Sequence, residues 1–125
     1  MELSANLINY VADNLVYFDV IQNMVGPAGY FRDPNDLDVY LQSSCFLPYL
    51  NGEKQGNNTD SIKERTQGLN GAMLVMFDAD TMLFPKETAW FHELQADGTI
   101  LEVKETQLYK EDHIGLKTLI DNNKV

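Results

Sequence analysis

The sequence predicts an α/β fold, and two features support this prediction. Gly71 to Phe77 (GAMLVMF) is an unbroken nonpolar run, typical of a strand covered on both faces. The preceding stretch, SIKERTQGLN, is predicted to be a helix capped by Asp60 and ended by Gly68 or Asn70. A helix followed by a strand buried on both sides indicates a parallel α/β sheet.

Further helices are predicted before this pair. Apolar residues recur at three- and four-residue spacings over residues 3–25, which predicts one long or two short helices. Gly26 and Pro27 end that pattern, since proline cannot continue a helix. An irregular, aromatic-rich region follows, with one short helix near residues 36–42.

Shorter elements are predicted after the nonpolar run. A turn at Pro85 and a short helix lead to Trp90 and Phe91, which we expect to lie in the core. The stretch TILEVKETQLY suggests a short strand, and EDHIGLKTLIDNN a helix or turn. We expect the EDHIG part to be exposed.

Composition limits the possible functions. The 125 residues fit one domain at most, and 44% of them are hydrophobic, as in ordinary globular proteins. The 19 acids against 9 lysines and arginines give a formal charge of -10. This balance argues against nucleic-acid and anionic-lipid partners, which need clustered cations. The sequence shows neither a membrane span nor an N-terminal signal peptide.

Cofactor and modification signals are few. Cys45 is the only cysteine, and no Asp or Glu cluster has a known metal-ligand spacing, so we predict no metal and no cofactor. Asn57-Asn58-Thr59 matches the N-glycosylation pattern within a polar stretch that we expect to be an exposed loop. Asn57 is therefore a glycosylation candidate.

Asp78 and Asp80 follow the nonpolar run directly, at the strand end where α/β sheets hold their active sites. One chemistry for such acids is phosphoryl transfer of the haloacid dehalogenase type. Its Asp-x-Asp-x-Thr/Val signature is incomplete here, since Met82 occupies the last position. Only 43 residues follow Met82, too few for the remaining parts of such a domain.

A second chemistry uses one acid to orient a histidine that serves a serine nucleophile, in the chain order Ser, Asp, His of α/β-hydrolases. The nucleophile motif Gly-x-Ser-x-Gly is absent from the 125 residues. Both histidines, His92 and His113, are predicted to be structural or solvated. For Asp80 taken alone, a turn or helix-capping role is the ordinary alternative.

Stretches spread along the chain resemble the C-terminal part of the palmitoyl-protein thioesterase family of α/β-hydrolases. From Val16 onward they are AGYFRDP with DVY, FLPYLNGE, the Gly56 to Thr59 region, LVMFDADT with Pro85 and AWF, and ETQLYKEDHIGLKTL. Together they cover about four fifths of the chain in the family's order, which is more specific than any single motif.

The resemblance implies a partial α/β-hydrolase fold and a hydrolase site. Residues 1–125 would be the C-terminal part of a single domain, without the N-terminal half of the sheet and the last strand. Asp80 matches the triad acid, and Asp78 would be a solvated neighbour that slightly raises the pKa of Asp80. Trp90 and Phe91 could instead line an acyl groove.

The family's serine and histidine lie outside the matched region, so we expect the 125 residues alone to be inactive. The resemblance implies S-acylated proteins or peptides and fatty acyl thioesters as partners of the complete enzyme, and a lysosomal or secretory location. The alternative is a non-catalytic acidic binding module or a degenerate relative.

Overall fold

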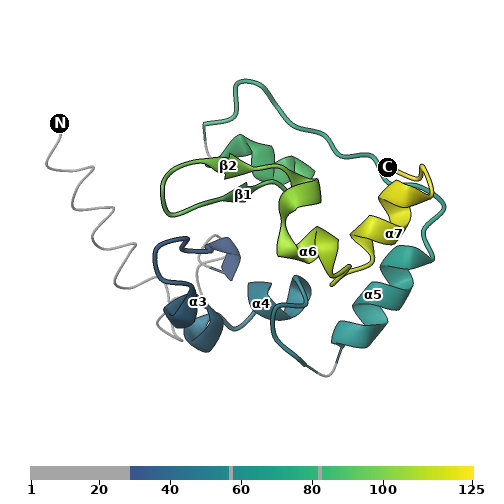
Figure 1. Ribbon diagram of the computed structural model, residues 1–125, viewed down its shortest axis with the longest axis horizontal. Helices are drawn as coiled ribbons and strands as arrows, with labels where there is room; N and C mark the ends of the chain where they lie inside the picture. The colour runs from purple at the N-terminus through teal and green to yellow at the C-terminus, as the bar shows by residue number, and fades with distance from the viewer. Residues whose placement is uncertain (1–28, 57, 82) are drawn as a thin grey trace, which may run out of the picture. The chain divides into compact units, whose positions relative to one another are not determined.

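The computed structural model describes residues 29–56, 58–81 and 83–125, and they belong to two compact units, residues 1–48 and 49–125. Figure 1 shows short helices and one small hairpin. The helices predicted over residues 3–25 and the glycosylation candidate Asn57 lie outside the described residues. Among the described residues, no helix has the length and hydropathy of a membrane span.

The first unit contains helix α3, Leu37–Ser43, where a short helix was predicted. Asp36 begins it, because its side chain accepts a hydrogen bond from the backbone N–H of Val39, one of the donors that the first helical turn leaves without a partner. Tyr40 on this helix is fully buried, and the Arg32 guanidinium lies 5.6 Å from the centre of its ring. Helix α4, Leu47–Leu50, begins in the first unit, which ends at Pro48, and its last two residues belong to the second unit.

The second unit begins its regular structure with α5, Thr59–Gln67, which confirms the predicted helix and its end at Gly68. The predicted cap was wrong by two residues. Asn58 occupies the N-cap position, and Asp60 lies within the first turn, where its negative charge favours the helix N-terminus.

The rest of the second unit is made of short elements. They are the 3-10 helix η2, Lys86–Trp90, strands β1, Glu93–Leu94, and β2, Ile100–Leu101, the 3-10 helix η3, Val103–Glu105, and helices α6, Gln107–Lys110, and α7, Leu116–Asp121. The strand predicted in TILEVKETQLY is confirmed only for Ile100–Leu101, since η3 and α6 occupy most of the rest of that stretch. The helix or turn predicted in EDHIGLKTLIDNN is confirmed as α7.

The core of the second unit lies where α5 and α6 contact α7. Leu116 and Leu119 on α7 are 3% and 2% exposed, Tyr109 on α6 is 9% exposed, and Thr106, which caps α6, is 1% exposed. This small core forms from α5 and the C-terminal end of the chain. Burial of two leucines and a tyrosine contributes several kcal/mol, at about 1.5–3 kcal/mol per large side chain.

The prediction of a buried strand at Gly71–Phe77 is wrong for the described structure. The segment is extended but belongs to no sheet, and Met73, Val75 and Phe77 are 86%, 55% and 71% exposed. The only sheet among the described residues is the antiparallel pair β1–β2, with Glu93 opposite Leu101. A parallel strand needs a neighbouring strand on each side for its backbone groups. Apart from the local turn at Phe77, the described residues bond the backbone of this segment only at Ala72, whose N–H donates to the Lys124 carbonyl at 2.7 Å.

Candidate active site

The candidate active site is the turn that follows the extended segment. The backbone N–H of Asp80 donates to the carbonyl of Phe77 at 3.1 Å, which closes the turn. The backbone N–H of Leu83 then donates to Oδ1 of Asp80 at 3.0 Å. This bond fixes the carboxylate relative to the backbone, which is the turn-acid arrangement that short acidic side chains favour.

Asp78 and Asp80 differ in exposure although they are two residues apart. The side chain of Asp78 is 96% exposed, whereas Asp80 is half-buried. Lys86 at the start of η2 donates from Nζ to the backbone carbonyl of Asp78 at 2.9 Å, and its ammonium lies 4.0 Å from the Asp78 carboxylate. An ion pair so exposed contributes little to stability. Of the two acids, Asp80 is therefore the one held in a fixed position.

Two of the apolar residues that follow this turn in the sequence are exposed. Leu83 and Phe84 are 56% and 88% exposed, and Pro85, joined to Phe84 by a cis peptide bond, is buried. Trp90 is 38% exposed, and Phe91 is half-buried, so the prediction that this pair lies in the core was wrong for Trp90.

Both histidines contact aromatic or acidic side chains other than Asp80. The ring of His92 makes an edge contact with Trp90, with 6.0 Å between the ring centres. The side chain of His113 is 21% exposed, and its Nε2 lies 2.8 Å from Glu111. Its Nδ1 is buried without a hydrogen-bond partner among the described residues. The structural role predicted for the histidines agrees with these contacts, but the expected exposure of His113 was wrong.

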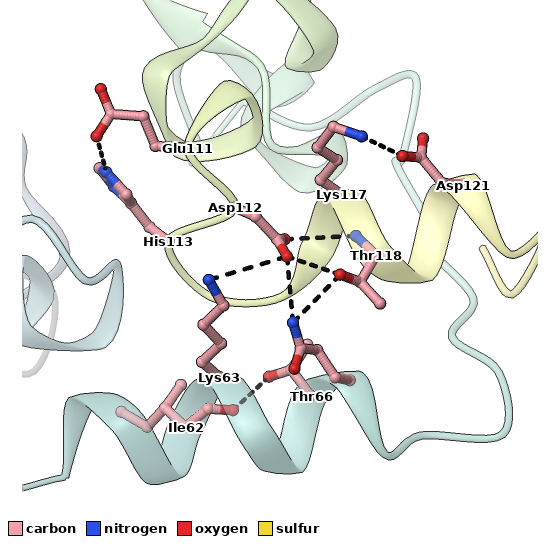
Figure 2. A network of polar contacts seen from close by, with 10 residues as sticks. Ile62, Lys63, Thr66, Glu111, Asp112, His113, Lys117, Thr118 and Asp121 are labelled. Atoms are coloured by element: carbon pink, nitrogen blue, oxygen red, sulfur yellow. Dashed lines mark hydrogen bonds and ion pairs between the residues drawn. The ribbon is translucent and has the colours of Figure 1, made fainter.

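A second polar cluster, centred on Asp112, was not predicted. Figure 2 shows Asp112, from the segment between α6 and α7, reaching toward both α5 and α7. Thr118 Oγ1 donates to its Oδ2 at 2.7 Å, and Gln67 Nε2 donates to the same oxygen at 3.2 Å. The Lys63 ammonium lies 4.0 Å from this carboxylate. The cluster joins the two helices of the core.

Burial of Asp112 disfavours its charged form, but this is outweighed by the hydrogen bonds from Thr118 and Gln67 and by the Lys63 charge. The pKa of Asp112 is therefore lowered from its ordinary value. A nearby pair acts similarly: the Lys117 ammonium and the Tyr109 hydroxyl both bond Asp121 and lower its pKa. These groups stabilise the helices, and none of them is a nucleophile beside a base.

One feature of the sequence could have indicated this cluster: Asp112 and Gly115 are residue types that tolerate the positive φ angles of a tight turn. Asp112 has φ +51° and Gly115 has φ +83°, and Asp and Gly are among the residues that adopt such angles most readily. A Cβ at Gly115 would lie 2.6 Å from Gln67 Cγ, so a side chain there would push α5 away. The pair Asp112 and Gly115 within EDHIG thus indicated a tight, packed turn instead of an exposed loop.

Metal binding has no support in the described ranges. No group of three or more His, Cys, Asp or Glu side chains is placed there to hold an ion. The arrangement around Asp80 offers one positioned carboxylate, next to exposed apolar side chains. A carboxylate at the exit of an apolar extended segment fits the acid position of an α/β-hydrolase.

Comparison with known proteins gives the family. The model of the palmitoyl protein thioesterase family matches residues 2–125. The chain is 36% identical to palmitoyl-protein thioesterase 1 of Caenorhabditis elegans over 126 aligned residues, which cover 98% of this chain and 41% of that protein. It is 37% identical to palmitoyl-protein thioesterase 3 of Dictyostelium discoideum, over 94% of this chain and 41% of the relative.

A more distant relative is the human lysosomal thioesterase PPT2, which is 32% identical over 73% of this chain and 30% of its own length. The chain belongs to the palmitoyl-protein thioesterase family, as its sequence indicated. Membership implies the α/β-hydrolase fold, and the helices and hairpin described here are consistent with part of it. The chain spans about two fifths, 41%, of the length of the first two relatives.

Proposed function

We propose that this chain forms the C-terminal part of a palmitoyl-protein thioesterase, a serine hydrolase that removes long-chain fatty acyl groups from protein cysteines. The family match over residues 2–125 supports this proposal. In the complete domain, flanking sequence supplies the N-terminal half of the sheet with the nucleophilic serine, and a last strand followed by the histidine. The extended segment Gly71–Phe77 becomes an inner strand of that sheet.

Asp80 is the proposed triad acid, and its position carries the proposal. It directly follows the extended segment, and the bond from the Leu83 N–H to Oδ1 holds its carboxylate in one orientation. A carboxylate held in this way accepts the N–H of a histidine and selects the tautomer that can take a proton from serine. It then stabilises the imidazolium that forms as serine attacks the thioester carbonyl. Asp78, which is 96% exposed, has no catalytic role in this mechanism.

The 125 residues alone are proposed to be inactive, because they contain no Gly-x-Ser-x-Gly motif. In a serine hydrolase, losing only the function of the acid lowers turnover by about 10⁴, and losing the nucleophile or base lowers it further. A non-catalytic acidic binding module or a degenerate relative is the alternative if no complete enzyme is encoded.

The proposed substrates are S-acylated proteins or peptides and fatty acyl thioesters. The proposed location is the lysosome or the secretory pathway, supported by relatives that are named lysosomal thioesterases. Glycosylation of Asn57 in that pathway is part of the same proposal.

The first experiment reads the transcript on both sides of this segment and expresses the complete reading frame. Two matched variants are then compared, Asp80→Asn and Asp78→Asn, with hydrolysis of a palmitoyl thioester as the assay. An asparagine keeps an oxygen at the Oδ1 position, so the Leu83 N–H retains its acceptor and the turn is preserved. We expect Asp80→Asn to lower kcat by about 10⁴ and Asp78→Asn to leave it nearly unchanged.

Equal activity of the Asp80→Asn variant and the wild type would exclude Asp80 as the triad acid. A transcript that encodes neither a serine motif upstream nor a histidine downstream would leave only the non-catalytic alternative.

A further inference from the structure

Helices α5 and α7 of the second unit run side by side in the same direction. Contacts between them and the residues that flank them join positions that advance together along both: Lys63 with Asp112, Gln67 with Thr118, and Leu69 with Lys124. In an antiparallel pair, early residues of one helix would instead meet late residues of the other. The chain therefore leaves α5 and α7 at the same side of the unit, as Figure 1 shows.

Helix α7 ends in a turn of defined shape. Asn123 has φ +53°, and its N–H donates to the Ile120 carbonyl at 3.0 Å. The N–H of Lys124 donates to the Leu119 carbonyl, also at 3.0 Å. These two bonds, made around a residue with left-handed backbone angles, form the Schellman motif that ends many helices. The motif fixes the direction in which the chain leaves α7.

The turn brings the chain to the start of the extended segment that leads to Asp80. The Lys124 carbonyl accepts the N–H of Ala72 at 2.7 Å. In antiparallel strands, two bonded residues exchange both of their hydrogen bonds, but the N–H of Lys124 is already bonded to Leu119. In parallel strands, a residue bonds the two residues that flank the one opposite it. The bond therefore fits parallel pairing, with Val125 opposite Ala72.

We propose that this bond begins a parallel strand pair between Gly71–Phe77 and the chain that follows α7, and that Asn123 and Lys124 are positioning residues for Asp80. The proposal rests on the proposed function, in which a last strand and the histidine follow α7. A strand, a helical crossover and a parallel strand beside the first form the usual connection of α/β folds, and α6 and α7 supply the helices of this crossover.

The register of this pair decides where the histidine meets the acid. Asp80 lies eight residues after Ala72, so the neighbouring chain reaches the level of Asp80 eight residues after Val125. A shift of one residue would move the side chains of the neighbouring strand to the opposite face of the sheet. The turn at Asn123 and the bond from Ala72 to Lys124 therefore set the distance between the Asp80 carboxylate and the histidine.

The pairing is tested in the complete protein by disulfides between introduced cysteines, in a Cys45→Ser background. Ala72→Cys with Val125→Cys should form a disulfide under mild oxidation, because facing residues of neighbouring strands lie within the Cα separation of about 4.4–6.8 Å that a disulfide spans. Two control pairs should not: Leu74→Cys with Val125→Cys, which is displaced by two residues, and Ala72→Cys with Lys124→Cys, whose side chains point to opposite faces. Absence of the first disulfide, or an equal yield in either control pair, would overturn the proposed register.

The positioning role is tested by two substitutions at Asn123 in the complete enzyme, with hydrolysis of a palmitoyl thioester as the assay. Asn123→Val disfavours the positive φ of the turn, whereas Asn123→Gly adopts it readily. We expect Asn123→Val to lower kcat at least tenfold with KM nearly unchanged, because it disturbs the contact between acid and histidine and not substrate binding. Asn123→Gly, the conservative variant, is expected to retain the activity.

The pH profile of kcat separates a positioning role from a general loss of stability. A carboxylate beside a histidine favours the charged imidazolium, so loss of this contact lowers the pKa of the histidine. The acidic limb of kcat should therefore move to lower pH in Asn123→Val. Gly98→Ala also places a side chain at positive φ, +83°, in the turn between β1 and β2, and should leave kcat and the limb unchanged. A loss of kcat without a shift of the limb, or an equal loss in Gly98→Ala, would overturn the positioning role.

Failure of this proposal is distinguishable from failure of the proposed function. If Asp80→Asn lowers kcat and Asn123→Val does not, Asp80 remains the triad acid and the positioning role fails. If Asp80→Asn retains full activity, the proposed function and the positioning role both fail. The cysteine pairs then still decide whether the two strands run parallel, because disulfide formation does not depend on thioesterase activity.

Discussion

The helices around Asp112 and the extended segment before Asp80 differ in where their partners lie. The carboxylate of Asp112 receives hydrogen bonds from Thr118 and Gln67, both in the described part of the same chain. The backbone of Met73–Met76 receives none from the described residues, and its apolar side chains are partly in water. The described residues therefore complete the first region, whereas they supply no partner strand to the second.

Among the changes to the helices around Asp112, Gly115→Ala is expected to cause the largest loss of stability. A Cβ at this position would lie 2.6 Å from Gln67 Cγ and 2.9 Å from the Lys63 carbonyl, and φ is +83°. We expect the free energy of unfolding to fall by about 3 kcal/mol, from backbone strain and overpacking together. Urea unfolding followed by circular dichroism measures this loss.

Gly98→Ala is the matched control for Gly115→Ala. Gly98 has the same φ of +83°, but a Cβ at this position would meet nothing within 4 Å, so only the backbone strain of about 1–2 kcal/mol remains. If both variants lose the same stability, the close packing of α5 against Gly115 contributes nothing.

A smaller effect is expected from Asp112→Asn, which keeps the side-chain shape and the tolerance of positive φ but removes the charge. We expect a loss of about 1–2 kcal/mol near neutral pH, because the charged acceptor of the Thr118 hydroxyl is lost. The control is Asp97→Asn, since Asp97 also has a lowered pKa, from its bonds with Thr99, but lies in an exposed turn. We expect the control to lose much less stability.

The pH dependence of the Asp112→Asn effect follows from the sign of the pKa shift. The folded pKa of Asp112 is lower than its value in the unfolded chain, which is about 3.9. The stabilisation is therefore complete above about pH 5 and is lost as the pH falls through the folded pKa. The difference between wild type and Asp112→Asn should shrink below about pH 4, and a difference that stays constant in acid would contradict this assignment.

The smallest effect is expected from Tyr109→Phe, which removes only the bond from the hydroxyl to Asp121 at 2.9 Å. The ring stays in the core, so the urea midpoint should fall by less than in Asp112→Asn. Tyr30→Phe is the control, because Tyr30 is 63% exposed and keeps its ring contact with Phe46. A larger loss for Tyr109→Phe than for Asp112→Asn would show that Asp121, and not Asp112, dominates the polar stabilisation.

Prediction from the sequence was accurate where neighbours along the chain decide the structure. The start of α3 at Asp36 follows from capping chemistry within four residues, and α5 ends at Gly68, a residue type that is unfavourable inside helices. The family was also predicted correctly, because the matching stretches keep the family's order over most of the chain. The position of Asp80 after an apolar segment is visible in the sequence itself. Its catalytic role stays a prediction.

Prediction was inaccurate where distant contacts decide the structure. Local polarity suggested that EDHIG is exposed, but Gln67, which is 45 residues away in the sequence, bonds Asp112 there. The opposite error occurred at Val75 and Trp90, whose apolar character indicated burial although both are exposed in this chain. The hydrophobicity of a residue indicates that its burial would be favourable, but it does not indicate whether another part of the protein covers it.

The sequence by itself determined the family, the helices α3 and α5, the turn acid Asp80 and an uncharged apolar segment before it. These depend on residue types and short spacings, which act through local hydrogen bonds and backbone angles. Only the tertiary structure decided that Asp112 joins α5 to α7 and that Gly71–Phe77 pairs with no strand among the described residues. The reason is that burial and strand pairing are properties of surfaces brought together from distant parts of a chain, and no local pattern specifies which surfaces meet.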